Sequence, residues 1–233
     1  MRVILFSATG MVGQGVLREC LRDSRVENVL AIGRAGTGQH HEKLREIVQP
    51  DVANLSAIQG ELSSYDACFF CLGVSSVGMK EADYRRVTYD LTLSVARRLA
   101  GPGMTFVYVS GTGTDSSARG RSMWARVKGE TENALLGLPF RAAYMFRPGY
   151  IQPLDGIAPK TRWVRVAYAA LAPFYPILKA LFPKYVTTTR QVACAMIQVA
   201  AHSVARSDSV ARSEGAPKRV LENDAINQVD CSG

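Results

Sequence analysis

Acidic side chains are missing from a long stretch in the second half of this sequence. No Asp or Glu occurs from Gly156 to Ser207, and the whole chain of 233 residues has a formal net charge of +8. The basic residues of the stretch are Lys160, Arg162, Arg165, Lys179, Lys184, Arg190 and Arg206. An acid-free basic stretch attracts cofactor phosphates, an acidic substrate or an anionic membrane surface, the alternative being a solvated basic surface. Because the basic residues alternate with apolar ones and no nucleic-acid motif occurs, we expect no nucleic-acid partner.

Long apolar runs are missing as well. The first apolar run, Val3 to Phe6, is too short for a signal peptide and ends at small residues. No segment offers the roughly 20 uncharged apolar residues of a membrane-spanning helix. We therefore expect a cytoplasmic protein, with peripheral contact at a membrane as the alternative.

Cysteine and histidine are scarce. The five cysteines are an odd number without a secretory signal, which indicates a reducing compartment. Cys68 and Cys71 have the C-x-x-C spacing, but they lie in an apolar run typical of a buried strand. Residues three apart in a strand point to opposite faces, so these thiols cannot share a metal. His40, His41 and His202 have no partner at metal-ligand spacing, and we predict no metal site.

Short apolar runs alternate with helical patterns through the first half of the chain. We expect strands at 3–6, 29–32, 47–48, 67–72, 104–109 and 140–146, and helices at 11–22, 84–100 and 123–136. The alternation is typical of βαβ units with a parallel sheet. The continuous apolar runs indicate strands that are covered on both faces. The predicted fold class is therefore α/β with a doubly wound parallel sheet.

The character of the chain changes after Pro148, where prolines become frequent. We expect a core over residues 1–150 and a small C-terminal cap with helices over 151–206. A polar tail over 207–233 would contain one last strand at 219–222. Thr187 to Thr189 would cap a helix that runs to about residue 205.

One segment has the pattern of a phosphate-binding turn. It joins the first expected strand to the first expected helix and reads Ser7-Ala8-Thr9-Gly10-Met11-Val12-Gly13. Glycines in such a turn let the backbone approach a pyrophosphate, which the N-terminus of the following helix binds. The predicted dinucleotide site of a Rossmann-type fold consists of Ser7, Thr9, Gly10, Met11, Val12 and Gly13. Ser7 replaces the usual glycine, and a serine adopts positive φ less readily.

The end of the second strand indicates which dinucleotide to expect. Folds that prefer NAD(H) place an acid here for the ribose 2′-hydroxyl, whereas this chain has Ile32-Gly33-Arg34 and no acid nearby. A guanidinium suits a 2′-phosphate, so we favour NADP(H) over NAD(H). The alternative is that Arg34 stacks on the adenine or points to solvent.

Five short motifs together resemble one family. In chain order they are the turn at residues 7–13, Cys71-Leu72-Gly73, Val107-Tyr108-Val109-Ser110, Val127-Lys128-Gly129-Glu130 and Phe146-Arg147-Pro148-Gly149. Their order resembles that of the atypical short-chain dehydrogenases/reductases. It is most similar to the group of the Tat-interactive oxidoreductase and to bacterial proteins labelled NAD-dependent epimerase/dehydratase. The resemblance covers roughly residues 1–200.

The resemblance implies roles for the matching positions. Those that would contact the cofactor, from the adenine to the nicotinamide, are Asp51, Val52, Leu72, Gly73, Pro148 and Gly149. Ser110 and Thr112 fall where the family has its catalytic serine or threonine. Lys128 matches the lysine that binds the nicotinamide ribose in the family and lowers the pKa of a catalytic tyrosine.

The position of that tyrosine, four residues before Lys128, is occupied by Trp124. The two residues share one helix face, but an indole N–H only donates a hydrogen bond and cannot exchange a proton as a phenol does. Tyr150 is the candidate for moving the proton instead, and Thr112 would orient a substrate oxygen. The alternative is that both only shape a cleft.

Two functions follow from this departure. The first is an NADP(H)-dependent oxidoreductase that acts on an unknown small carbonyl or alcohol. The second is a non-catalytic NADP(H)-binding sensor or scaffold. The apolar, aromatic and basic segment Trp163 to Phe182 suits a substrate-side cap or a contact in a homodimer, and next a peripheral contact with an anionic membrane.

Overall fold

Parallel strands form the central sheet of the protein. The computed structural model describes residues 1–158, 165, 166, 168, 170, 174–208 and 219–231. In these residues the sheet has seven strands in the order β3-β2-β1-β4-β5-β6-β9. They are β1 Arg2–Phe6, β2 Asn28–Gly33, β3 Leu44–Val48, β4 Ala67–Phe70, β5 Thr105–Val109, β6 Ala142–Arg147 and β9 Val220–Glu222. The predicted α/β class with a doubly wound parallel sheet is confirmed.

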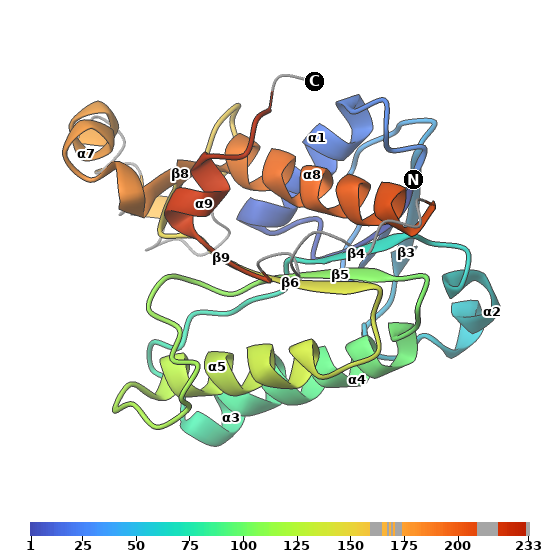
Figure 1. The fold of residues 1–233 in the computed structure, drawn as a ribbon, viewed down its shortest axis with the longest axis horizontal. Coiled ribbons are helices and arrows are strands. Elements are labelled where there is room, and N and C mark those ends of the chain that lie inside the picture. Colours follow the sequence, from blue (N-terminus) through green and yellow to red (C-terminus); the bar gives the residue numbers. More distant parts are fainter. Residues whose placement is uncertain (159–164, 167, 169, 171–173, 209–218, 232–233) are drawn as a thin grey trace.

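Helices cover both faces of this sheet (Figure 1). On one face lie α1 Met11–Arg22 and α8 Thr189–Asp208. On the other lie α3 Glu81–Arg85, a π-helical turn at Arg86–Asp90, α4 Leu91–Leu99 and α5 Met123–Leu136. A short turn of helix, α2 Gln59–Leu62, precedes β4.

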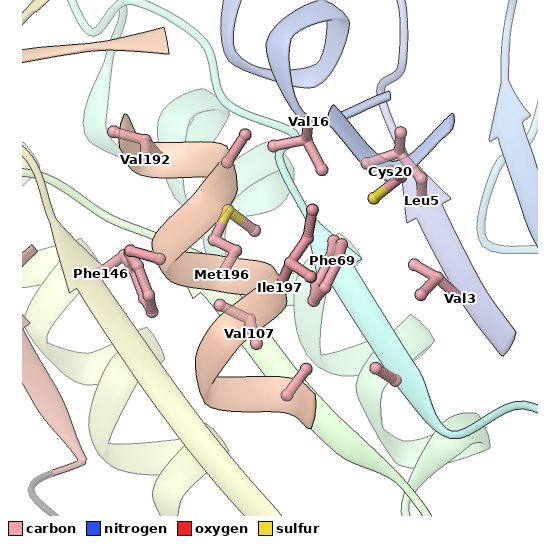
Figure 2. Close-up of a cluster of buried hydrophobic side chains, with 14 of the residues drawn as sticks. Val3, Leu5, Val16, Cys20, Phe69, Val107, Phe146, Val192, Met196 and Ile197 are labelled. Atoms are coloured by element: carbon pink, nitrogen blue, oxygen red, sulfur yellow. The ribbon is translucent and has the colours of Figure 1, made fainter. Parts of the chain in front are cut away.

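The two faces of the sheet carry two separate apolar clusters. In the cluster on the α1 and α8 side, Met196 and Ile197 of α8 pack with Phe69, Val107 and Phe146 of the strands (Figure 2). In the cluster on the other face, Phe70 and Phe106 are buried as completely. The strands are therefore covered on both faces and need no alternation of polar residues.

The two cysteines of the C-x-x-C spacing belong to opposite faces. Cys68 is part of the cluster on the α4 and α5 side, whereas Cys71 packs against the cluster on the α1 and α8 side. The prediction that their thiols point apart is confirmed.

A smaller layer follows the core. The strand β7 Tyr150–Gln152 pairs in parallel with β8 Val186–Thr188, and α7 Tyr175–Leu181 precedes β8. The Thr188 hydroxyl accepts the N–H of Gln191, as expected of a helix cap at this position. The short helix α9 Asn223–Asn227 follows β9. Trp163 and residues 209–218 of the predicted tail lie outside the described residues.

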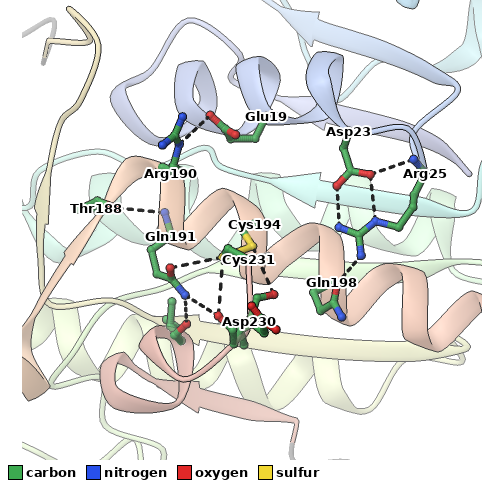
Figure 3. The surroundings of a disulfide bond; sticks show 12 residues. Glu19, Asp23, Arg25, Thr188, Arg190, Gln191, Cys194, Gln198, Asp230 and Cys231 are labelled. Atoms are coloured by element: carbon green, nitrogen blue, oxygen red, sulfur yellow. Dashed lines mark hydrogen bonds and ion pairs between the residues drawn. A yellow bond between two sulfur atoms is a disulfide. The ribbon is translucent and has the colours of Figure 1, made fainter. Parts of the chain in front are cut away.

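A disulfide ties the end of the chain to α8. It joins Cys194 to Cys231, whose Cα atoms are 5.8 Å apart (Figure 3). The amide of Gln191 on α8 donates to the carbonyls of Ile226 and Val229, so hydrogen bonds reinforce the same contact. The odd cysteine count did not reveal this pair, because a count cannot show which two thiols the fold brings together.

None of the helices in the described part of the chain is long and apolar enough to span a membrane.

Candidate cofactor and catalytic site

The candidate site lies at the carboxyl ends of the strands. The strand order reverses between β1 and β4, and ligands of such sheets bind in the crevice at that point. The loops after β1 to β6 all leave this edge, and together with the first turn of α1 they carry the residues predicted to hold the cofactor except Lys128, which lies on α5.

The turn after β1 is built around Ser7, whose φ is +65°. Ser7 therefore adopts the left-handed conformation that glycine usually supplies at this position. Its N–H donates to the carbonyl of Ile32 (3.3 Å), and its carbonyl accepts the N–H of Gly10 (2.9 Å). These bonds compensate for the backbone strain of a serine here.

Gly13 lies in the first turn of α1, where it packs directly against the backbone of Ser7. A Cβ on Gly13 would lie 2.0 Å from the carbonyl oxygen of Ser7, so only glycine fits. Gly10 caps α1 without a side-chain hydrogen bond. The N–H groups of the first helical turn thus have no side-chain acceptor at the cap and remain suited to an anion.

The loops after β2 and β3 meet beside the adenine side of the predicted site. The N–H of Gln49 donates to the carbonyl of Gly33 (2.9 Å), which places Asp51 and the buried Val52 close to the end of β2. Arg34 is exposed and has no hydrogen bond or ion pair with any residue that the structure describes. Glu46 of β3 is an acid near this loop, but its carboxylate accepts the N–H of Thr37 (2.8 Å).

On the other side of the reversal, the chain leaves β4 next to the Ser7 turn. The N–H of Cys71 donates to the carbonyl of Phe6 (3.3 Å), so Leu72 and Gly73 follow directly at the crevice. The geometry brings these two residues beside the glycine turn, although they lie far from it in the sequence.

The loop after β5 holds its hydroxyl groups by internal bonds. The Thr114 hydroxyl donates to the Gly111 carbonyl (2.7 Å) and lies 2.8 Å from the Ser110 hydroxyl, which therefore donates to Thr114. The Thr112 hydroxyl donates to the Arg147 carbonyl (3.0 Å), and its N–H donates to the Pro148 carbonyl (2.9 Å). The loops after β5 and β6 are thus one unit, in which these hydroxyl protons are already engaged.

Lys128 reaches this unit from α5. Its ammonium donates to the Ser110 carbonyl at 2.5 Å. Burial lowers the pKa of Lys128 to about 8, an effect that the negative charge of Glu132 partly opposes. The structure therefore brings Ser110, Thr112 and Lys128 together.

Trp124 and Tyr150 have different neighbours in the site. Trp124 packs on the loop after β5, where a Cβ on Gly113 would lie 3.3 Å from Cη2 of the indole. Tyr150 follows Gly149 and donates its hydroxyl to Oε1 of Gln152 (3.0 Å). Its ring stacks on Tyr168 with centroids 5.1 Å apart, and burial raises its pKa.

The sequence reasoning missed the buried ion pair behind Lys128. The Nε atom of Arg147 lies 3.1 Å from both carboxylate oxygens of Glu132, whose side chain is 1% exposed. Arg147 also bonds Glu222 of β9 (2.9 Å) and the hydroxyl of Ser116. A signal was present, because Glu132 follows Lys128 by four residues on the inner face of α5 and Arg147 ends a buried strand.

Among the described residues, no group of three His, Cys, Asp or Glu side chains could hold a metal ion.

Comparisons with known proteins identify relatives of this chain. No protein-family model matches the sequence. The chain is 28% identical over 156 residues to Protein fmp52, mitochondrial, of Emericella nidulans, covering 64% of this chain and 66% of the relative. It is 28% identical over 152 residues to Protein HTATIP2 of Rattus norvegicus, covering 64% and 62%. The resemblance to the atypical short-chain dehydrogenases/reductases is confirmed. The matched part spans about two thirds of the length of these relatives.

Solved structures share the fold. The structure of Pal from Bacillus thuringiensis has a TM-score of 0.60 at 13% identity, with 84% of this chain and 72% of that chain covered. The UDP-glucose 4-epimerase of Thermotoga maritima has a TM-score of 0.57 at 12% identity, with 85% and 73% covered. At these identities the likeness concerns the fold alone.

The predicted cytoplasmic location is wrong by these comparisons. Similar curated proteins from Emericella nidulans, Debaryomyces hansenii and Scheffersomyces stipitis are all named as mitochondrial. The prediction relied on the lack of an apolar leader, and composition alone does not reveal every targeting route.

Gly13→Ala tests the closed turn. Because the new methyl group would meet the Ser7 carbonyl, we expect the free energy of unfolding to fall by about 1–3 kcal/mol. Denaturant titration measures this. Gly60→Ala is the matched control, since no heavy atom lies within 4 Å of the place that its new methyl group would take. Equal stability of the two variants would contradict the close approach of Gly13 to the Ser7 carbonyl.

Glu132→Gln tests the buried ion pair. Removing the charge leaves the Arg147 guanidinium without its main partner, and we expect a loss of about 3 kcal/mol in the free energy of unfolding. The same variant should lower the pKa of Lys128 further, because Glu132 raises it. The control is Glu81→Gln, whose partner Arg126 is near the surface and whose effect should be small. A Glu132→Gln protein as stable as the control would contradict the role of the pair.

Proposed function

We propose that this chain binds a nicotinamide dinucleotide across the ends of β1 and β4. The observation that carries the proposal is the turn of residues 7–13, in which Ser7 takes a left-handed conformation and Gly13 contacts its carbonyl. Such a turn leaves room for a pyrophosphate at the N-terminus of α1. The pyrophosphate would lie on residues 9–13, with Leu72 and Gly73 on its other side.

The solved neighbours support a nicotinamide dinucleotide. The structure of MoeE5 is titled as a complex with UDP-glucose and NAD, and that of WbmH from Bordetella bronchiseptica as a complex with NAD+. Their identities to this chain are 18% and 13%, with TM-scores of 0.58 and 0.55. The choice between NAD(H) and NADP(H) therefore depends on residues of this chain.

The preference for NADP(H) depends on Arg34. Its guanidinium is exposed beside the end of β2 and is not engaged by any described residue, so it is available for a 2′-phosphate. The acid that would bind a ribose hydroxyl is absent at this position, and the nearby Glu46 carboxylate is bound by Thr37. Asp51 and Val52 would border the adenine from the loop after β3.

Calorimetry with Arg34→Ala tests this preference. A charge-assisted hydrogen bond contributes about 1.5–3 kcal/mol, so the affinity for NADPH should fall about 10- to 150-fold. The affinity for NADH should stay nearly the same. Arg97→Ala, an exposed arginine of α4, is the control and should change neither. Equal losses for both cofactors would remove the assignment of Arg34, and no binding by the unaltered protein would remove the proposed function itself.

The proposed reaction is hydride transfer between this cofactor and a small carbonyl or alcohol. The nicotinamide would lie beside Pro148 and Gly149 on one side and beside Ser110 and Lys128 on the other. When bound, it would supply the hydride chemistry. Residues 1–150 would form the cofactor core, with 151–206 as the substrate-side cap and 207–233 as the tail. The alternative function is a non-catalytic sensor or scaffold, which Trp124 favours because it cannot replace a phenol as an acid. NADPH binding without turnover of any carbonyl would support the alternative.

The exposed apolar surface of α7 is the observation that favours a substrate-side cap. None of its residues is buried, and Phe174, Ile177, Leu181 and Phe182 are 52–67% exposed. α7 contacts β8, which pairs with the strand β7 that begins at Tyr150. We propose that this apolar surface covers a bound substrate, with a homodimer contact or an anionic membrane surface as the other occupants.

Sedimentation separates these occupants. If α7 covers the substrate, we expect the protein to sediment as a monomer at micromolar concentration. We also expect it not to sediment with vesicles of anionic lipid at low salt. A dimer that Leu181→Glu dissociates would assign the surface to a second copy. Binding to the vesicles that the same variant abolishes would assign it to a membrane.

A further inference from the structure

In the part of the chain that the structure describes, the partner of the Lys128 ammonium is a neutral group. Among the described residues, no carboxylate forms an ion pair with it, and the bond that it makes is to the neutral carbonyl of Ser110. The nearest acid on its inner helix face, Glu132, is bound by Arg147 through both oxygens. Lys128 therefore differs from the lysines of ordinary surface ion pairs, and no described carboxylate holds its proton strongly.

The other groups of the site are poor sources of a proton. Trp124 has an indole N–H, which does not titrate in water. The hydroxyl protons of Ser110, Thr112 and Thr114 are engaged with neighbouring oxygens.

Tyr150, the candidate from the sequence, is also engaged. It donates to Gln152, and both burial and the nearby Tyr175 raise its pKa above the usual value. A phenol with a raised pKa releases its proton less readily, so Tyr150 is better suited to shaping the substrate side.

Lys128 has the opposite property. Its pKa of about 8 lies close to neutral pH, which is where general acids and bases work most efficiently. The charge that faces it is that of Glu132 on α5, which raises the pKa against the larger effect of burial, and Arg147 on β6 binds this carboxylate. The loop after β5 contributes no charged side chain between Ser110 and Thr114.

We propose that Lys128 itself is the proton donor and acceptor of the site, in place of the tyrosine that Trp124 replaces. The inference rests on the proposed oxidoreductase function. In the reducing direction a bound reduced dinucleotide would supply the hydride for the substrate carbonyl carbon and would be oxidised. The carbonyl oxygen takes a proton from Nζ of Lys128, and the neutral amine then regains a proton from water. In the oxidising direction the neutral amine accepts the alcohol proton.

The first test measures the pKa of the Lys128 amine and requires no turnover. The ¹³Cε signal of Lys128, assigned by its loss in Lys128→Arg, is followed through a pH titration of the protein with and without NADPH. We expect a midpoint near pH 8, as for the pKa above. A midpoint above 10 would overturn the proposal, whether or not a substrate is known.

The second test separates proton transfer from cofactor binding. Lys128→Arg keeps the charge and a hydrogen-bond donor, but a guanidinium does not release a proton in proteins. We expect NADPH affinity within about threefold of the unaltered protein and turnover reduced at least about 100-fold. Lys43→Arg is the control and should change neither, since Lys43 precedes β3 at the opposite edge of the sheet and its ammonium bonds the carbonyl of Asp23.

The third measurement restores the phenol. Trp124→Tyr combined with Lys128→Arg should recover part of the lost rate and shift the pH profile of turnover away from pH 8. Full turnover in Lys128→Arg, or equal losses of affinity and rate, would assign Lys128 a positioning role and overturn the proposal. An unaltered protein that binds no dinucleotide would instead show that the proposed function has failed.

Discussion

The buried ion pair of Arg147 and Glu132 is the interaction on which the candidate site depends. It joins the second half of α5 to the end of β6, and the same guanidinium reaches Glu222 on β9. Breaking such a pair leaves an uncompensated charge in the interior, which costs several kcal/mol. Because Arg147 also offers its backbone carbonyl to Thr112, one residue fixes both the helix that carries Lys128 and the loop that receives it.

A backbone contact completes this arrangement. A Cβ on Gly129 would lie 1.7 Å from the carbonyl oxygen of Asp115, so α5 touches the loop after β5 directly. The adjacent Lys128 then meets the Ser110 carbonyl with little freedom to move away. The ammonium is thus held by the packing of α5 on this loop and by its hydrogen bond to a neutral carbonyl, which is why desolvation dominates its pKa.

The features that sequence could predict are those that repeat locally. Continuous apolar runs predicted the buried strands β1, β2 and β4 to β6, and the turn of residues 7–13 predicted the start of α1. The edge strand β3 was predicted too short, since the charged Arg45 and Glu46 interrupt the apolar run by which the buried strands were identified.

The rest depends on contacts between distant residues. The disulfide of Cys194 and Cys231 spans 37 positions, and Arg147 and Glu222 lie 75 apart, so spacing gives no hint of either pairing. The positive φ of Ser7 could not be predicted either, because it opposes the intrinsic preference of serine and is stabilised by bonds to Ile32 and Gly10. The roles of Thr112 and Tyr150 required their bonding partners, which no pattern in the chain reveals.

Keeping Lys128 at this place reduces the stability of the fold at neutral pH. Its pKa is about 8 in the folded protein, against the usual lysine value of 10.5, so below pH 8 both states hold the proton and the full cost of burying the charge remains. Between pH 8 and 10.5 the folded state releases the proton first, and this contribution to the free energy of unfolding rises with pH. A lysine with only a structural task would be replaced by an apolar residue at no such cost. The retained charge, held beside a loop whose hydroxyl groups are engaged and next to a tryptophan that cannot supply a proton, is consistent with the proposal that the amine transfers the proton.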